Sequence, residues 1–286
     1  MIYAYLNGDI VDRKILSISV DDFGFSRGNV VFELTRIYGK HPFKLDMHLS
    51  RLMKSIDICN IDQPYSKKDF KNMVQALIEK NNFPQSVIKI YITQGTPKSI
   101  GWSLEVGKNF DAKVILIHEP FKAFSDSFPA HEKYYKQGVA IATVDAERTQ
   151  PEAKTTNYVN AIIASSAVAT NGFEDILYIN RQGEVTECSR SNIFFIKNGV
   201  LITPKTGVLV GVTRQVVLKL ACENNIMVEE RVVLKSEISS MDEAFMTGST
   251  VELMPIKQID DMHFDLSSFS VYKKLWQAFK VEISKV

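Results

Sequence analysis

Residues 187–214 read ECSRSNIFFIKNGVLITPKTGVLVGVTR, and this stretch decides how the rest of the sequence is interpreted. Its apolar segments, residues 193–196 and 201–204, flank Asn198-Gly199, a dipeptide that favours a tight turn. Two short apolar segments joined by such a turn predict a β-hairpin. A glycine turn then leads into a run of residues that is typical of the start of a helix.

Two features of this stretch are unusual for a plain hairpin. Glu187 ends an alternating run and is followed by small and polar residues before the apolar segment begins. Gly211 stands just before Thr213, where the first N–H groups of a helix and a hydroxyl could meet an anion. These features point to a ligand-binding segment, and a hairpin with one surface glutamate is the plain alternative.

The stretch closely resembles the signature of the class IV (fold type IV) pyridoxal-phosphate aminotransferases. That signature has a glutamate, a small residue, an asparagine followed by an aliphatic and an aromatic residue, a threonine, and an aliphatic-any-glycine-aliphatic-any-basic ending. In this sequence the fixed positions are held by Glu187, Ser189, Asn192, Ile193, Phe194, Thr203, Leu209, Gly211, Val212 and Arg214. The loop between Thr203 and Leu209 is one residue shorter than the family pattern.

Length and composition set the broad class of the protein. With 286 residues the chain is long enough for two domains, and 45% apolar with 23% charged residues is ordinary for a globular protein. The formal net charge of +1 gives no electrostatic reason to expect nucleic acid or a membrane as a partner. The three cysteines, Cys59, Cys188 and Cys222, lack metal-binding spacing and favour a reducing cytoplasm, so no metal is expected. No apolar run approaches membrane-spanning length.

The local patterns predict a mixture of strands and helices. Residues 30–38 and 87–93 are rich in β-branched and aromatic residues and should form strands. Apolar residues at helical spacing predict one helix from Asp46 and another from a capping box at Ser66. Residues 21–28 are polar and contain two glycines, which predicts a loop.

The order of these elements favours an α+β fold, because strands and helices do not alternate strictly as they would in a doubly wound sheet. Residues 119–131 carry prolines among polar residues and should connect two domains. We therefore expect a smaller N-terminal α/β domain over residues 1–118 and a larger C-terminal domain over residues 132–286. The resemblance implies that the larger domain binds pyridoxal phosphate, in the fold type IV architecture of D-amino acid aminotransferases.

Pyridoxal 5′-phosphate chemistry requires a lysine that forms a Schiff base and a carboxylate that keeps the pyridine nitrogen protonated. Many family members show Lys-Thr-x-Asn-Tyr around the catalytic lysine, and Lys154 with Thr155, Asn157 and Tyr158 matches this pattern. The resemblance implies that Lys154 forms the Schiff base and that Glu187 is the partner of the ring nitrogen. Without the resemblance, a lysine just before a helix is usually a solvated charge.

The other cofactor contacts also follow from the resemblance. Residues 48–52, His-Leu-Ser-Arg-Leu, match a family stretch that delivers its arginine to the cofactor phosphate, whereas Arg51 on sequence alone is an ordinary surface charge. Leu209 would pack on the cofactor ring or, alternatively, be a plain core leucine, and Tyr158 would reach the cofactor hydroxyl. The residues implied to bind the cofactor are Arg51, Lys154, Tyr158, Glu187, Leu209, Val212, Thr213 and Ser249.

The expected strand over residues 30–38 places Phe32, Leu34 and Arg36 on one face. By itself, Arg36 is either a solvated charge at a sheet edge or a charge in a pocket. The resemblance implies a substrate pocket, in which Phe32, Arg36 and Tyr158 agree best with branched-chain aminotransferases, although Leu34 replaces their usual small residue. Lys89 falls near the arginine that those enzymes use for glutamate. The residues implied to contact substrate are Phe32, Arg36, Lys89, Thr250 and Val251.

Three hypotheses for the function follow. The first is a transaminase, a homodimer like its family, that moves the amino group of a branched-chain L-amino acid to 2-oxoglutarate through Lys154. Residues 95–100 lack the Arg-x-His carboxylate trap of the D-amino acid enzymes. The second is an aminodeoxychorismate lyase that releases pyruvate and 4-aminobenzoate; that enzyme has a match for Arg36 but a threonine where Leu34 stands. The third is a cofactor-binding protein without efficient turnover.

Overall fold

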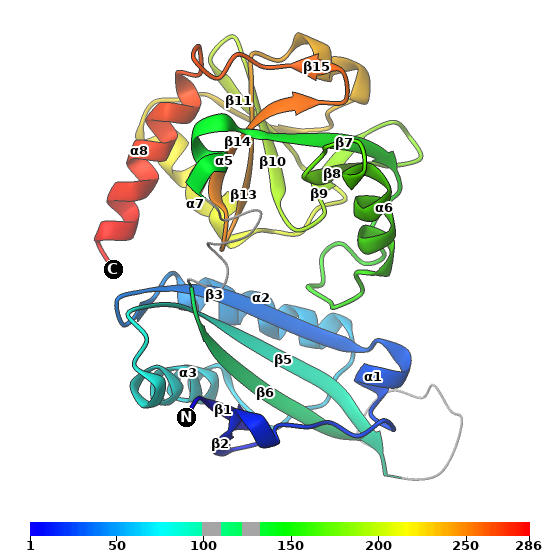
Figure 1. The fold of residues 1–286 in the computed structure, drawn as a ribbon, viewed down its shortest axis with the longest axis vertical. Coiled ribbons are helices and arrows are strands. Elements are labelled where there is room, and N and C mark those ends of the chain that lie inside the picture. Colours follow the sequence, from blue (N-terminus) through cyan, green and yellow to red (C-terminus); the bar gives the residue numbers. More distant parts are fainter. Residues whose placement is uncertain (99–109, 122–131) are drawn as a thin grey trace. The chain divides into compact units, whose positions relative to one another are not determined.

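The computed structural model describes residues 1–98, 110–121 and 132–286 (Figure 1). The chain forms two compact units: unit 1 combines Met1–Ala123 with Ala153–Asn157, and unit 2 combines Phe124–Glu152 with Tyr158–Val286. Helices and strands are mixed in both, so the predicted α+β class is confirmed. Most of the expected connection 119–131 and the last two residues of segment 95–100 lie outside the described residues, and the domain boundaries stay a prediction.

Unit 1 is built on a six-stranded sheet in the order β2-β1-β6-β5-β3-β4, whose neighbouring strands are all antiparallel. The strands are β1 (Tyr3–Leu6), β2 (Asp9–Asp12), β3 (Val30–Tyr38), β4 (His41–Pro42), β5 (Gln85–Pro97) and β6 (Phe110–Pro120). The predicted strands over residues 30–38 and 87–93 are therefore confirmed. Figure 1 shows β3, β5 and β6 as the long strands of this sheet.

Two helices of unit 1, α2 (Leu45–Ile58) and α3 (Lys67–Asn81), cover one face of its sheet. The predicted capping box is present, because the Ser66 hydroxyl accepts from the Asp69 N–H and the Asp69 carboxylate accepts from the Ser66 N–H. A 3-10 helix, η1 (Arg13–Ile15), follows β2. The core between helices and sheet includes Leu49, Leu52, Phe70, Leu77, Ile88 and Ile90.

Residues 21–28 do not form the predicted loop, since they fold into the short helix α1 (Phe23–Arg27). The Asp22 carboxylate caps this helix by accepting from the Gly24 N–H at 2.6 Å, and it also accepts from the Thr93 hydroxyl at 2.7 Å. Gly28 ends the helix in the left-handed conformation, at a φ of 73°, which glycine adopts without steric cost. A helix this short is set by its caps rather than by apolar periodicity, which explains why the pattern did not reveal it.

Strand β3 presents different side chains to its two faces. Val31, Glu33 and Thr35 lie opposite Ile92, Ile90 and Ile88 of β5, on the face that packs against α2 and α3. Phe32, Leu34 and Arg36 lie on the other face, opposite Tyr91, Lys89 and Val87 of β5 in that order. Near its start, the other edge of β3 pairs with the 153–157 segment through a bridge between Val31 and Thr155.

Unit 2 contains a nine-stranded mixed sheet in the order β12-β11-β10-β13-β14-β7-β8-β9, with β15 pairing with β14. Parallel pairs join β11 to β12, β14 to β7 and β7 to β8. The strands are β7 (Val139–Asp145), β8 (Asp175–Ile179), β9 (Val185–Cys188), β10 (Asn192–Lys197), β11 (Val200–Pro204), β12 (Val228–Arg231), β13 (Glu243–Gly248), β14 (Glu252–Ile259) and β15 (Met262–His263). The hairpin predicted around Asn198-Gly199 is formed by β10 and β11.

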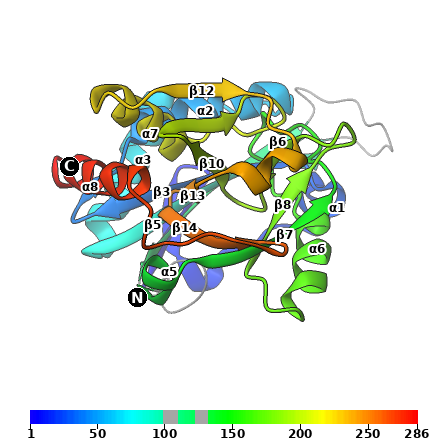
Figure 2. The same ribbon diagram turned by 90° about the horizontal axis from the view of Figure 1, so that it is seen from above.

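The helices of unit 2 are α5 (Glu132–Gln137), α6 (Val159–Ala169), α7 (Val212–Glu223), α8 (Val271–Ser284) and the 3-10 helix η2 (Lys235–Ser240). In Figures 1 and 2, α7 and α8 lie together at one end of this sheet, and α6 lies against β8 at the other. Ala161 of α6 packs in a small core cluster with Ile176 and Tyr178, whereas Val159, Ile162 and Ile163 are 62%, 62% and 64% exposed.

The described helices include none with both the length and the apolar character needed to cross a membrane. Within the same residues, no group of three or more His, Cys, Asp or Glu side chains is placed to hold a metal ion.

Candidate functional site

Lys154 belongs to unit 1, where its backbone is fixed against the edge of β3. The Phe32 N–H donates to the Lys154 carbonyl at 2.9 Å, and the Thr156 N–H donates to the Val30 carbonyl at 3.1 Å. On the side of α2, the Lys154 N–H donates to Ser55 Oγ at 3.0 Å. The Lys154 amine lies 4.4 Å from the centroid of the Phe32 ring and is half-buried. The lysine is therefore held in place by strand and helix, unlike a freely solvated charge.

Arg51 of α2 is part of a buried charge cluster in unit 1. Its Nε donates to Glu33 Oε1 at 2.7 Å and its Nη2 to Glu33 Oε2 at 2.9 Å. His48, one helical turn earlier, places Nδ1 2.8 Å from Glu33 Oε2. Burial would raise the pKa of Glu33, but the charge of Arg51 and hydrogen bonds from His48 and Arg51 outweigh it and lower the pKa to about 2. The reading of Arg51 as an ordinary surface charge is wrong.

The candidate substrate residues of unit 1 lie on the face of β3 and β5 that α2 and α3 do not cover. Arg36 is only 9% exposed, with its guanidinium carbon 3.0 Å from the centroid of the Phe121 ring, so it is not a solvated edge charge. Lys89 Nζ forms an ion pair with Glu119 Oε2 at 2.8 Å. Burial would raise the pKa of Glu119, but hydrogen bonds from Lys89 and Arg13 lower it. Lys89 is thus committed to a carboxylate of its own chain.

Glu187 of unit 2 is a buried carboxylate with several donors. Its Oε2 accepts from the Leu209 N–H at 3.0 Å and from Asn192 Nδ2 at 3.2 Å. Its Oε1 accepts from Arg148 Nη1 at 2.5 Å. Asn192 also donates to the Leu209 carbonyl at 2.8 Å and so ties β10 to the loop before α7. Sequence reasoning missed Arg148, because no pattern marks an arginine in the polar segment ahead of Lys154.

The segment before α7 packs tightly against the same asparagine. A Cβ added at Gly211 would lie 2.0 Å from Asn192 Oδ1, so only glycine fits at this position. Val212 and Thr213 form the buried first turn of α7, and in the described residues no side chain caps that turn. The predicted glycine turn and helix start are therefore confirmed.

Thr247 ends the buried part of β13, directly opposite Asn192 of β10, and its side chain shares a face of the sheet with the Asn192 side chain. Its Oγ1 is buried and, within the part of the chain that the structure describes, has no hydrogen-bond partner. Ser249 and Thr250 follow it as half-buried residues, and Val251 is buried. Sequence reasoning did not single out Thr247, although it stands beside the predicted Ser249.

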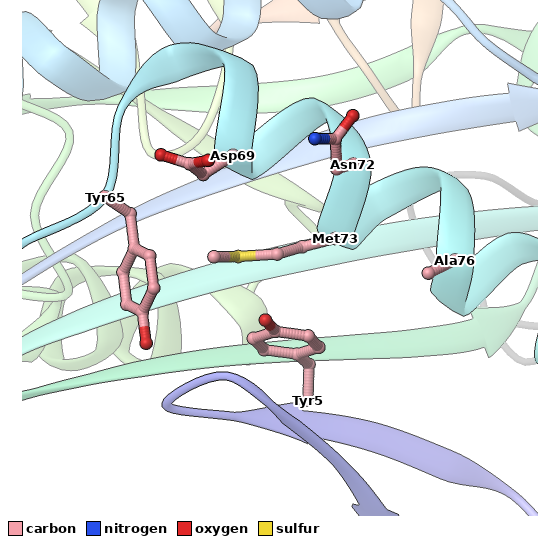
Figure 3. A pocket seen from close by; sticks show the side chains of 6 residues that line it. All are labelled: Tyr5, Tyr65, Asp69, Asn72, Met73 and Ala76. Carbon is pink, nitrogen blue, oxygen red and sulfur yellow. The ribbon is translucent and has the colours of Figure 1, made fainter.

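Of two hollows in the surface, one is lined by a predicted site residue and the other is not. One, of about 390 Å³ in unit 2, includes Tyr158 and is lined by Tyr158, Ala161, Ile162, Ser165, Ser166, Glu174, Asp175, Ser189 and Arg190. The other, of about 300 Å³ in unit 1, is lined by Tyr5, Tyr65, Asp69, Asn72, Met73 and Ala76. Figure 3 shows Asp69, Asn72, Met73 and Ala76 on α3, with Tyr5 below them and Tyr65 beside Met73. None of the predicted site residues is among those six.

Comparison with known proteins gives a consistent result. The sequence profile of the family described as amino-transferase class IV matches residues 30–259. A D-alanine aminotransferase of Bacillus licheniformis is 31% identical over 89% of this chain and 87% of its own. The branched-chain amino acid aminotransferase structure of Escherichia coli has 25% identity and a TM-score of 0.88, covering 98% of this chain and 94% of its own.

A third relative carries a different activity in its name. It is a structure from Legionella pneumophila, described provisionally as a 4-amino-4-deoxychorismate lyase, with 26% identity and a TM-score of 0.83, covering 95% of this chain and 97% of its own. The profile match spans most of the chain, and the structural matches confirm the predicted fold type IV architecture. The chain belongs to the class IV aminotransferases and is a pyridoxal-phosphate-dependent transaminase.

Proposed function

We propose that this enzyme transfers the amino group of an L-amino acid with a branched apolar side chain to 2-oxoglutarate. The observation that supports this donor is the aromatic wall beside Lys154. The Phe32 ring, 4.4 Å from the Lys154 amine, stacks on the Tyr91 ring at a centroid distance of 5.9 Å. An apolar substrate side chain against such a wall leaves water and gains packing contacts.

The residues of unit 2 fit bound pyridoxal phosphate. Among the described residues, the buried Thr247 Oγ1 has no hydrogen-bond partner. A phosphate oxygen nearby would accept a hydrogen bond from it. The first turn of α7, which no described side chain caps, offers N–H groups suited to an anion. When bound, the cofactor supplies an aldehyde and an electron-withdrawing ring.

Each predicted residue would then have a defined role. Lys154 Nζ would be the nucleophile toward the cofactor aldehyde and would carry the proton of the substrate Cα. Glu187 would place a negative charge at the ring nitrogen, and Arg148 with the Leu209 N–H keeps its carboxylate oriented. Arg51, Val212, Thr213 and Ser249 would hold the phosphate, Tyr158 would reach the ring hydroxyl and Leu209 would pack on the ring. Phe32, Arg36, Lys89, Thr250 and Val251 would contact the substrate.

The proposal is tested by single half-reactions. The purified enzyme, loaded with cofactor, is mixed with one amino acid at a time, and the loss of the bound cofactor's visible absorbance is followed. L-leucine, L-isoleucine, L-valine and L-glutamate should react, and D-alanine should not. Reaction with D-alanine faster than with every L-amino acid would overturn the proposed substrate while leaving the family assignment intact.

A second candidate, supported by the buried Arg36 and by the Legionella relative, is aminodeoxychorismate lyase activity. In that reaction Arg36 would bind a substrate carboxylate. The discriminating measurement is pyruvate release from aminodeoxychorismate without any added amino acceptor. Pyruvate release together with unreactive L-leucine would favour the lyase.

Replacing Arg36 by methionine should separate the two half-reactions of a branched-chain transaminase. The dicarboxylic substrate needs a cation for its side-chain carboxylate, whereas leucine does not. We expect Arg36→Met to weaken the glutamate half-reaction by roughly 1.5–3 kcal/mol, the range for a hydrogen bond to a charged group, and to change the leucine half-reaction far less. Stopped-flow rates with each amino acid measure both effects.

Lys89→Met is the companion variant in this experiment, because Lys89 is the other predicted substrate-binding cation on this face and is paired with Glu119. Equal losses for leucine and glutamate in Arg36→Met would indicate a structural role, through the packing of Arg36 on Phe121. A loss selective for glutamate in Lys89→Met alone would move the carboxylate contact to Lys89.

We also propose that the enzyme works as a homodimer in the cytoplasm. The exposed apolar residues of α6 support association, since such side chains at a surface commonly mark an interface. The three cysteines are free, which suits a reducing compartment. Sedimentation at assay concentration should give a dimer, and an active monomer under those conditions would contradict the proposal.

A further inference from the structure

Glu33 is a buried carboxylate of unit 1 that binds both Arg51 and His48. It lies on the helix-facing side of β3, is 1% exposed, and has Arg51 on both of its oxygens and His48 on one. Burial lowers the pKa of His48, so the imidazole is neutral near neutral pH. An ionised Glu33 can only accept, so His48 Nδ1 carries the proton and donates to it.

We propose that Glu33 is a positioning residue that orients the Arg51 guanidinium for the cofactor phosphate. This inference rests on the proposed phosphate-binding role of Arg51. A guanidinium is planar and has five N–H donors in a fixed fork. Glu33 engages the edge formed by Nε and Nη2 with two hydrogen bonds, which fixes both the plane of the group and the direction of its Nη1 end.

Preorganisation gives this arrangement its value for binding. A long arginine side chain loses rotamer freedom when it binds a ligand, and a side chain already held by a buried carboxylate has less freedom left to lose. His48 supports the carboxylate from the same face of α2, one turn before Arg51. The backbone carbonyl of Arg51 accepts from Ser55 Oγ at 3.0 Å, and the Lys154 N–H donates to the same Ser55 oxygen. Ser55, one turn after Arg51 in α2, thus links the backbone of Arg51 to the backbone of Lys154.

The negative charge of Glu33 acts against this effect, because it repels the phosphate. The ordering of Arg51 outweighs this repulsion. The two effects have opposite signs in a variant that removes the charge and keeps the shape of the side chain. Glu33→Gln therefore separates them.

The experiment compares two ligands of the apoenzyme, pyridoxal phosphate and pyridoxal, which reacts with the same amine but lacks the phosphate. Dissociation constants are measured by absorbance titration for wild type, Glu33→Gln and Glu33→Asp. We expect Glu33→Gln to weaken pyridoxal phosphate by roughly 10- to 150-fold, the equivalent of one hydrogen bond to a charged group, and pyridoxal by less than about 3-fold. Glu33→Asp keeps the charge but is too short for the same two-bond geometry. It should therefore also weaken pyridoxal phosphate more than pyridoxal, but by a smaller factor than Glu33→Gln.

Equal weakening of both ligands would overturn the proposal and leave Glu33 as a purely structural residue. Tighter binding of pyridoxal phosphate by Glu33→Gln would overturn it in the other direction, by showing that repulsion dominates. If Glu33→Gln does not fold, the selectivity of Glu33→Asp decides between these outcomes. A wild-type protein that does not prefer pyridoxal phosphate over pyridoxal would instead refute the proposed phosphate site itself, so the two failures are distinguishable.

Discussion

Lys154→Ala is expected to abolish turnover and the covalent attachment of the cofactor. No other described lysine of unit 1 shares the geometry of Lys154, whose amine lies beside Phe32 and whose backbone is held by β3 and Ser55. The loss should be essentially complete, because one side chain supplies both the nucleophile and the proton carrier. The measurement is borohydride reduction followed by peptide mass spectrometry, with the mass of the reduced cofactor expected on the Lys154 peptide of wild type and absent from the variant.

The control for this variant is Lys205→Ala, at an exposed lysine. The backbone contacts of residue 154 do not involve its side chain, so the variant should unfold at nearly the same temperature as wild type. A Lys154→Ala protein that stays active and still carries reducible cofactor would exclude Lys154 as the reactive lysine.

Glu187→Gln should keep bound cofactor but lower turnover on the order of 10²-fold or more. Glutamine keeps an oxygen that can accept from the Leu209 N–H, so the loop before α7 should remain in place. The variant loses the ion pair with Arg148 and, under the proposed function, the negative charge at the ring nitrogen. The measurement is the rate of the leucine half-reaction at saturating substrate, compared with the cofactor content of the same sample.

Glu184→Gln is the matched control, because Glu184 stands in the turn just before β9 and bonds to Asn180 instead of the candidate site. Activity of Glu187→Gln within about 2-fold of wild type would show that Glu187 is not the partner of the ring nitrogen.

Much of the fold could be predicted because its signals are local. The turn Asn198-Gly199, the capping box at Ser66 and the glycine before α7 each determine the backbone within a few residues. The five-residue helix α1 escaped because it depends on two caps. The exposure of Val159, Ile162 and Ile163 on α6 depends on tertiary packing, which the periodicity of apolar residues does not specify.

The candidate site was predictable only in part, for a physical reason. The resemblance to the family locates Lys154, Arg51 and Glu187, whose chemical roles stay predictions. Their partners come from distant parts of the chain: Glu33 lies 18 residues from Arg51, and Arg148 lies 39 residues from Glu187. Hydrogen bonds over such separations depend on strand pairing and helix placement, which residue patterns do not specify.

The two faces of β3 have a consequence for how this enzyme could diversify or be engineered. Under the proposed function, positions 32 and 36 touch substrate and position 34 lies on the same face, whereas position 33 on the opposite face holds Arg51. A library randomised only at the three even positions would therefore explore new specificities while leaving the anchoring of the cofactor untouched. Under these proposals, cofactor affinity and substrate choice depend on alternate residues of one nine-residue strand, so each could change without the other.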